Sequence, residues 1–155
     1  ARAGRHRDLQ HDVRYAVELP PVFGRSDRPA GGAPCMAADD AHHYNGDECK
    51  SYIMVRAAAC THDAILDAIA RGDFYATQGP HFTWTLDGDA LTIHCSPVEQ
   101  IVFFDNLCWN GSRVTRGAAL TEVHYTVPAN ERFLRLELTD AAGRVAWSSA
   151  IPVNR

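Results

Sequence analysis

The segment richest in potential metal ligands runs from position 39 to position 48 of the 155-residue chain. Its acidic and imidazole side chains are Asp39, Asp40, His42, His43, Asp47 and Glu48. Carboxylates and neutral imidazoles suit zinc, manganese and iron. Asp40 and His42 form a D-x-H triplet, and side chains two positions apart share a face in extended backbone. The pattern therefore predicts that Asp40 and His42 bind a divalent metal ion.

A metal centre of this kind would serve hydrolysis. Bound metal ions lower the pKa of a coordinated water and clamp phosphoryl oxygens, which neutralises the charge that develops in the transition state. The alternative is a solvated polar turn, because Asp side chains often cap such turns and a lone D-x-H triplet arises easily by chance. Two protein ligands do not form a tight site, and the rest of the chain offers no obvious further set. Both interpretations stay open at this point.

Short apolar runs around this segment indicate the elements that would position it. The run Cys35–Ala38 stops at Asp39, as a buried parallel strand does when it emerges into a functional loop. Two further strands are predicted at Tyr52–Val55 and Phe74–Thr77. Between them a helix is predicted to begin at the N-cap Thr61 and to stop at Gly72. Residues 35–80 thus have the pattern of an α/β unit.

From His81 onward the helical period disappears. The strand pattern of Phe82–Leu86 and Ala90–His94 flanks Asp87-Gly88-Asp89, which is typical of a β-hairpin. Four further strands are predicted, at Ile101–Phe104, Val123–Val127, Phe133–Leu138 and Arg144–Trp147. About six or seven short strands separated by turns predict a small antiparallel β-sandwich for residues 81–155.

Residues 1–34 form an irregular N-terminal segment in this interpretation. Val13–Leu19 has a strand-like pattern, and the glycines and prolines between Gly24 and Pro34 indicate an exposed loop or disorder.

Composition narrows the classes of function. The net charge of −4 gives no basic face, so no nucleic-acid partner is expected. No apolar run approaches the roughly 20 residues that cross a bilayer, and the first thirty residues lack a secretory signal, so a soluble protein without membrane contact is expected. The five cysteines form no C-x-x-C pair and match no zinc-finger spacing. Free thiols in a reducing cytoplasm are the expectation.

Other polar and aromatic side chains are assigned structural roles. The aromatic residues of the strands are expected to fill the core more readily than to line a stacking surface. They are Trp84, Phe103, Phe104, Trp109, Tyr125, Phe133 and Trp147. His94 and His124 are predicted to be surface or hydrogen-bonded histidines. Three further side chains could reach a phosphate but are also taken as structural, namely Arg56, Gln78 and His81.

The order of several sequence blocks resembles the end of the catalytic domain in the PHP (polymerase and histidinol phosphatase) family. The blocks are residues 37–42, 46–47, 51–57 and 64–80, followed more loosely by 133–138 and 143–148. The resemblance covers about Cys35 to Val153, and the order of the blocks is more specific than any single motif.

This resemblance implies a fold, a site and a reaction. The family has a distorted (β/α)7 barrel that binds up to three metal ions at the C-terminal ends of its strands, where loops vary freely. Residues 35–80 would then be the C-terminal portion of that catalytic domain, followed by the β-sandwich. The closing D-x-H motif of the family falls on Asp40 and His42, with manganese, zinc or iron as the metal. Asp39 and His43 become candidates for orienting those ligands.

The chain departs from the family upstream of this motif. The family also uses an H-x-H motif and a glutamate, whereas this chain has no H-x-H and offers only His6, His11 and Glu18 before Asp39. A whole barrel needs far more chain than the 38 preceding residues. The expectation is the C-terminal part of a metal-dependent phosphoesterase, with an incomplete site and a small phosphorylated substrate for the parent enzyme. An incomplete barrel would expose apolar surface and invite self-association. The alternative is a non-catalytic β-sandwich accessory or binding domain.

Overall fold

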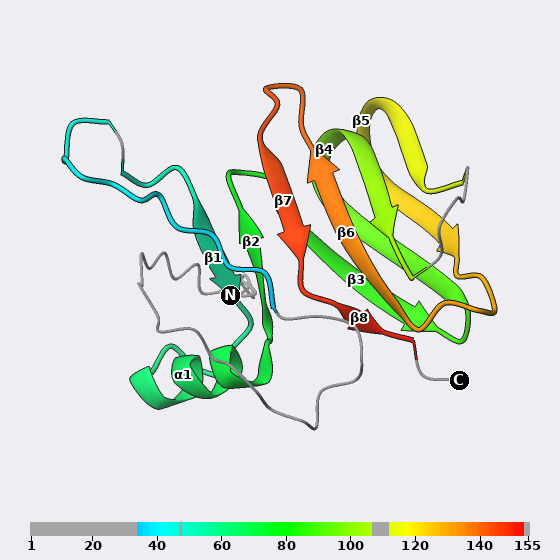
Figure 1. The fold of residues 1–155 in the computed structure, drawn as a ribbon, viewed down its shortest axis with the longest axis horizontal. Helices are drawn as coiled ribbons and strands as arrows, with labels where there is room; N and C mark the ends of the chain where they lie inside the picture. Colours follow the sequence, from blue (N-terminus) through cyan, green and yellow to red (C-terminus); the bar gives the residue numbers. More distant parts are fainter. Residues whose placement is uncertain (1–33, 47, 107–111, 154–155) are drawn as a thin grey trace, which may run out of the picture.

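Antiparallel pairing organises most of the chain into a single curled sheet (Figure 1). The computed structural model describes residues 34–46, 48–106 and 112–153. Their strands are β1 (Tyr52–Val55), β2 (Phe74–Thr77), β3 (Phe82–Asp87), β4 (Ala90–Phe104), β5 (Val114–Thr126), β6 (Phe133–Thr139), β7 (Val145–Ser148) and β8 (Ile151–Pro152), with helix α1 (His62–Arg71) between β1 and β2. The sheet order is β1-β2-β7-β6-β4-β3, with β5 also paired to β4 and β8 to β6.

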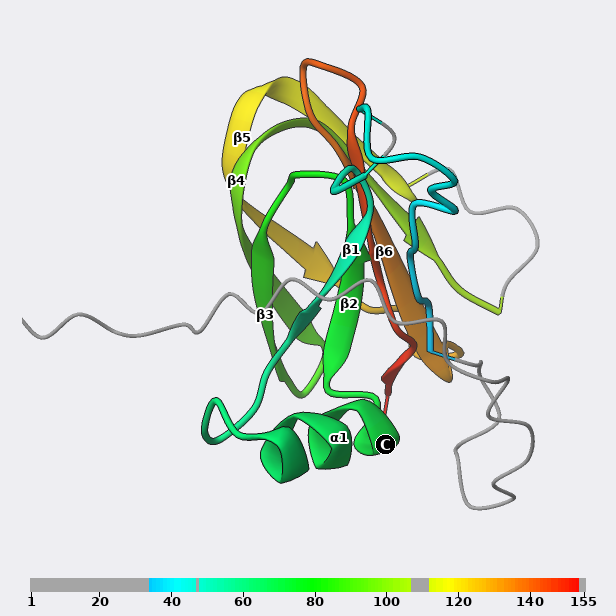
Figure 2. The same ribbon diagram turned by 90° about the vertical axis from the view of Figure 1, so that its left-hand side faces the viewer.

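The curl of the sheet comes from its longest strands, β4 and β5 (Figure 2). The first half of β4 pairs with β3 and the second half pairs with β6, while β5 follows β4 along both halves. The β4–β5 register shifts between His94 and Val98 and again between Val98 and Gln100. Pro97 lies in this stretch and has no N–H to donate, so regular pairing is interrupted there. The two strands predicted at Ala90–His94 and Ile101–Phe104 are therefore one bent strand.

The hydrophobic core lies inside the curl. It combines side chains from β3 to β8, since alternate residues of each strand point inward. Phe103 of β4 is fully buried and stacks on Tyr125 of β5, with ring centroids 4.0 Å apart. The other members are Phe82, Leu91, Ile93, Val98, Ile101, Val123, Val127, Leu134, Leu136, Leu138, Ala146 and Ile151.

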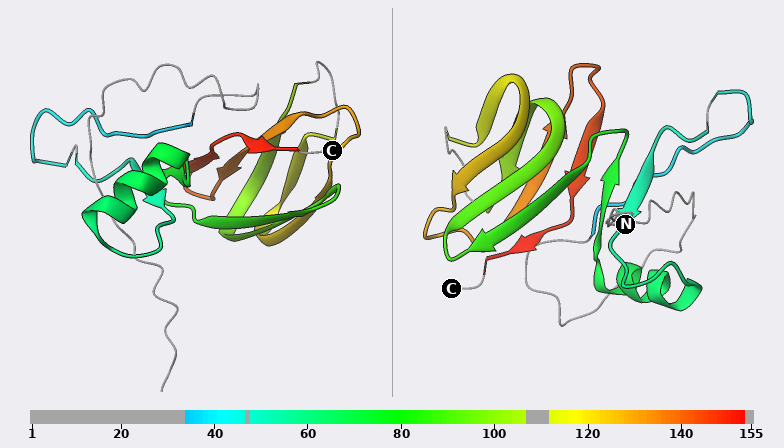
Figure 3. Two further views of the ribbon diagram at one scale, coloured as in Figure 1. Left: turned by 90° about the horizontal axis from the view of Figure 1, so that it is seen from below. Right: turned by 180° about the vertical axis from the view of Figure 1, so that it is seen from behind.

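Helix α1 lies at one end of β1 and β2, as two further views show (Figure 3). Its limits match the sequence prediction, because the Thr61 hydroxyl accepts the Ala64 N–H and Gly72 ends the helix with a φ of +82°. Glycine adopts this left-handed conformation without the steric penalty of a Cβ. Ile65 and Ala68 are buried, whereas Leu66 on the other side of the helix is exposed. With ten residues, this helix of the described chain is neither long nor apolar enough to cross a bilayer.

The predicted fold class is wrong. In a (β/α)7 barrel, the strands on either side of a helix run parallel, whereas β1 and β2 flank α1 and pair with each other antiparallel. The described residues of the 35–80 segment therefore contain no portion of such a barrel. The strands after position 81 do not form a separate sandwich either, because β2 pairs with β7 and joins them in one curled, half-barrel sheet.

Several predictions of single strands are confirmed, although the predicted architecture is wrong. The strands predicted at Tyr52–Val55 and Phe74–Thr77 are confirmed as β1 and β2. The predicted hairpin is confirmed too, and its turn residue Gly88 has a φ of +59°. Cys35–Ala38 is not a strand, because it makes no ladder and leaves Met36 41% exposed. The strand-like run Val13–Leu19 lies outside the described residues.

Candidate functional site

The D-x-H triplet lies in a loop that leaves and re-enters the fold next to β1. Asp39 closes this loop, because its Oδ1 accepts the backbone N–H of Lys50 at 2.9 Å and that of Ser51. Within the loop, the Gly46 N–H donates to the Glu48 carboxylate at 2.8 Å. A loop whose ends are held together by its own side chain has the character of a compact surface loop, a type that often carries function.

The predicted ligands Asp40 and His42 are both exposed, and so is His43. Asp40 has a φ of +52°, so the backbone is not extended at the triplet. The argument from alternating strand faces consequently does not apply here. No hydrogen bond or ion pair to another described residue engages Asp40 or His42, which leaves both side chains available to a ligand.

The donor set of the loop fits a metal ion in type but not in number. A carboxylate and an imidazole are suitable ligands for zinc, manganese or iron. Within residues 34–46, 48–106 and 112–153, no group of three or more His, Cys, Asp or Glu side chains gathers to hold an ion. Structural zinc sites use four protein ligands and catalytic sites three. Asp40 and His42 can therefore supply part of a centre, and further ligands have to come from elsewhere.

Asp39, the candidate for orienting a metal ligand, contacts the other end of its own loop. Its carboxylate faces the amides of residues 50 and 51, so it fixes the loop ends. We expect Asp39→Ala to speed amide hydrogen exchange at Lys50 and Ser51 by about tenfold or more, because a hydrogen bond to a charged acceptor contributes about 1.5–3 kcal/mol. The matched variant Asp40→Ala should leave both amides unchanged. Equal exchange rates in the two variants would contradict this role.

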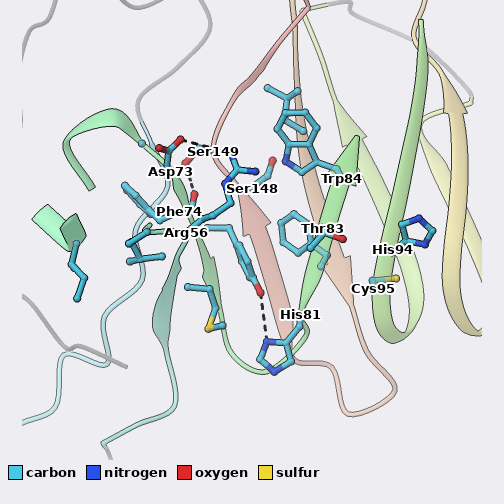
Figure 4. A pocket seen from close by; sticks show the side chains of 18 of the residues that line it. Arg56, Asp73, Phe74, His81, Thr83, Trp84, His94, Cys95, Ser148 and Ser149 are labelled. Atoms are coloured by element: carbon cyan, nitrogen blue, oxygen red, sulfur yellow. Dashed lines mark hydrogen bonds and ion pairs between the residues drawn. The ribbon is translucent and has the colours of Figure 1, made fainter. Parts of the chain in front are cut away.

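A second feature is an open groove of about 640 Å³ between the β1–α1–β2 region and the β3–β4 hairpin (Figure 4). Its volume lies in the range of small-molecule sites. Apolar walls come from β1, β2 and β3, and polar groups come from β4, the end of β7 and the segments next to β1, β2 and β3. The polar and aromatic side chains that line it include Arg56, Asp73, His81, Trp84, His94 and Ser149.

Most polar groups of the groove have partners within the fold. Arg56 lies 3.9 Å from Asp73, which also pairs with Arg71 at 2.8 Å. His81 Nδ1 lies 3.5 Å from the Tyr75 hydroxyl, and the dashed line in Figure 4 marks this contact. The side chain of Arg56 is 85% exposed, so its charge remains accessible to a ligand. Sequence patterns did not reveal this groove, because its walls come from segments between residues 54 and 151.

The structural roles predicted for other side chains are partly confirmed. His94 and His124 lie exposed on the outer face of the sheet and both approach Glu122, at 3.5 and 3.0 Å. The prediction that strand aromatics fill the core holds for Phe103 and Tyr125. It is wrong for Trp84, which is 37% exposed in the groove, and for Phe104, which is 46% exposed. Trp109 lies outside the described residues.

Comparison of the chain with models of protein families, with curated proteins and with solved structures finds no match.

Proposed function

We propose that this chain contributes to a metal-dependent phosphoesterase, in which Asp40 and His42 are two ligands of the metal centre. The substrate class is a small phosphate ester that is cleaved by metal-activated water. The remaining ligands would come from polypeptide other than the described residues. The reaction class is proposed because the sequence blocks resemble those of the PHP family. The proposal does not require the (β/α)7 barrel, which the antiparallel pairing of β1 and β2 excludes.

The observation that carries the proposal is the exposed and unengaged state of Asp40 and His42 on a loop held closed by Asp39. The Asp39 carboxylate accepts amides 11 and 12 positions away, so it fixes the ends of the loop that carries both side chains. Fixing the ends lowers the conformational freedom that two ligands lose when they bind a common ion.

The chemistry divides between the ion and the chain. When bound, a zinc, manganese or iron ion supplies an acidified water and a positive charge for the phosphoryl oxygens. Asp40 and His42 position the ion, and His43 is available to contact the substrate or to orient a ligand. Asp39 keeps the loop closed while these exposed groups face their partner.

Calorimetric titration of the purified chain with zinc chloride tests this assignment. We expect one ion per chain with weak affinity, because the chain supplies two ligands where tight sites use at least three. Asp40→Ala and His42→Ala should each abolish the binding. The control His124→Ala removes an exposed histidine from the opposite region of the sheet and should retain it. Binding that survives in Asp40→Ala, or that is lost in the control, would exclude the loop as the site.

A second candidate is a non-catalytic accessory or binding domain, and the groove favours it. The described strands form a continuous core without help from another chain, and the groove adds an open site with an accessible guanidinium on Arg56. The same titration separates the two candidates. A folded chain that takes up no zinc supports the binding domain, whereas uptake that depends on Asp40 supports the phosphoesterase.

A further inference from the structure

A buried carboxyl group lies outside the candidate site, in the turn between β5 and β6. Glu131 is 3% exposed, and its Oε1 accepts the Tyr125 hydroxyl at 3.2 Å. Its other oxygen, Oε2, is buried and has no hydrogen-bond partner among the described residues. A buried acceptor without a partner carries a desolvation penalty, so its protonation state matters to the fold.

The neighbouring charges also disfavour an ionised Glu131. The Asp105 side chain is 0% exposed, and its carboxylate is held by the Arg113 guanidinium, with Nε of Arg113 3.1 Å from Oδ2. Burial, and after it the interaction with Asp105, raises the pKa of Glu131 to about 7, against the opposing effects of Tyr125 and Arg113. The ionisable groups that act on Glu131 are thus Tyr125 in β5, Asp105 directly after β4 and Arg113 directly before β5.

Protonation relieves the repulsion between the Glu131 and Asp105 carboxyl groups, which interact in this buried region. With a proton on Oε2, Glu131 becomes a donor that the Asp105 carboxylate can accept, as in other carboxyl pairs that share one proton. Arg113 then balances the single remaining negative charge of the pair.

We propose that the proton shared by Glu131 and Asp105 is a pH-sensitive latch that holds the segment after β4 against the turn before β6. Two neighbouring bonds lie across the same junction. The Arg132 N–H donates to Asn106 Oδ1 at 2.7 Å, and Asn106 Nδ2 donates to the Asn130 carbonyl at 3.2 Å. The turn also holds the residue that follows β8, since the Val153 N–H donates to the Arg132 carbonyl. Loss of the proton places two negative charges at this junction and loosens it.

The direction in which pH changes the stability follows from the pKa of Glu131 in the folded and the unfolded chain. The ordinary glutamate pKa of 4.5 applies to the unfolded chain, so the folded state binds this proton more tightly. The contribution of Glu131 is therefore fully present below about pH 4.5 and declines as the pH rises to about 7. Through this group alone, the folding equilibrium constant should fall roughly 200-fold between pH 4 and pH 8.

Two measurements test the latch. Carbon-detected NMR of the wild-type chain should give a Glu131 carboxyl titration centred near pH 7. Above that pH, hydrogen exchange at the Arg132 amide should exceed the rate expected from pH alone. Denaturant unfolding of Glu131→Gln should show a stability advantage over wild type that grows with pH, because the amide stays neutral and can still donate to Asp105.

The control is Glu99→Gln, which removes an exposed glutamate of β4 and should show no such growth. A Glu131 midpoint near the ordinary glutamate value would overturn the proposal, as would a difference between Glu131→Gln and wild type that is constant with pH. If Glu131→Gln fails to fold, the wild-type titration alone decides.

Discussion

Phe103→Ala is expected to lower the free energy of unfolding by about 3–5 kcal/mol, because Phe103 is the largest fully buried side chain among the described residues. Phe103 is fully buried, and its ring stacks on Tyr125 at the centre of the curl. Alanine leaves a cavity bounded by β4, β5 and β6, and a sheet that is hydrogen bonded on both sides of β4 relaxes little to fill it. Denaturant titration followed by circular dichroism measures the loss.

The adjacent residue provides the control. Phe104 belongs to the same strand but points to the outer face and is 46% exposed. Phe104→Ala should therefore cost less than about 1 kcal/mol, since surface substitutions usually have small effects. If the two alanine variants were equally stable, the inward direction of Phe103 and the register of β4 would be wrong.

Arg113→Met is expected to cost about 3–5 kcal/mol at pH 7, because removing one partner of a buried ion pair leaves a charge uncompensated. Arg113 donates from Nε and Nη2 to the Asp105 carboxylate, whose side chain is fully buried. Methionine keeps much of the apolar volume, so the loss reports the charge and its hydrogen bonds.

Arg116→Met is the matched control for this charge effect. Arg116 is exposed and donates to Gln100 on the surface at 2.8 Å, so its replacement should change the unfolding free energy by less than about 0.5 kcal/mol. A loss in Arg113→Met no larger than that in Arg116→Met would show that Asp105 is solvated, and the buried carboxyl pair would then have no basis.

Local signals in the sequence predicted local structure well. Thr61 and Gly72 marked both ends of α1, and the Gly88 turn marked the β3–β4 hairpin, because capping and turn geometry depend on a few neighbouring residues. The first half of β5 escaped prediction. Its residues Gly117, Ala118 and Ala119 have low strand propensity, and they lie where the β4–β5 register shifts, between the pairs Val98–Leu120 and Gln100–Arg116.

The architecture could not be predicted from the same signals. A strand–helix–strand order usually indicates parallel strands, and the pattern around α1 is compatible with either direction. The antiparallel pairing of β1 with β2 joins residues 19 to 25 positions apart, and the pairing of β2 with β7 joins residues 69 to 73 positions apart. Such long-range pairings leave no short-range periodicity in the sequence.

In the candidate loop, too, the residue types could be predicted from the sequence but their geometry could not. Residue types alone identified Asp40 and His42 as possible ligands, whereas the left-handed backbone at Asp40 and the closing bonds of Asp39 were not foreseeable from the pattern. The buried Glu131 was missed as well. Its environment is assembled from Asp105, Arg113 and Tyr125, which are separated along the chain and meet through the pairing of β4 with β5.

Paramagnetic broadening by manganese(II) is the most direct measurement of whether Asp40 and His42 share a cation. In the folded chain, stepwise addition of manganese chloride should broaden the NMR signals of the 39–43 segment first, and those of His94 and His124 later or not at all. This selectivity should vanish in Asp40→Ala. Uniform broadening across all exposed carboxylates and imidazoles, or selective broadening that persists without the Asp40 carboxylate, would contradict the assignment.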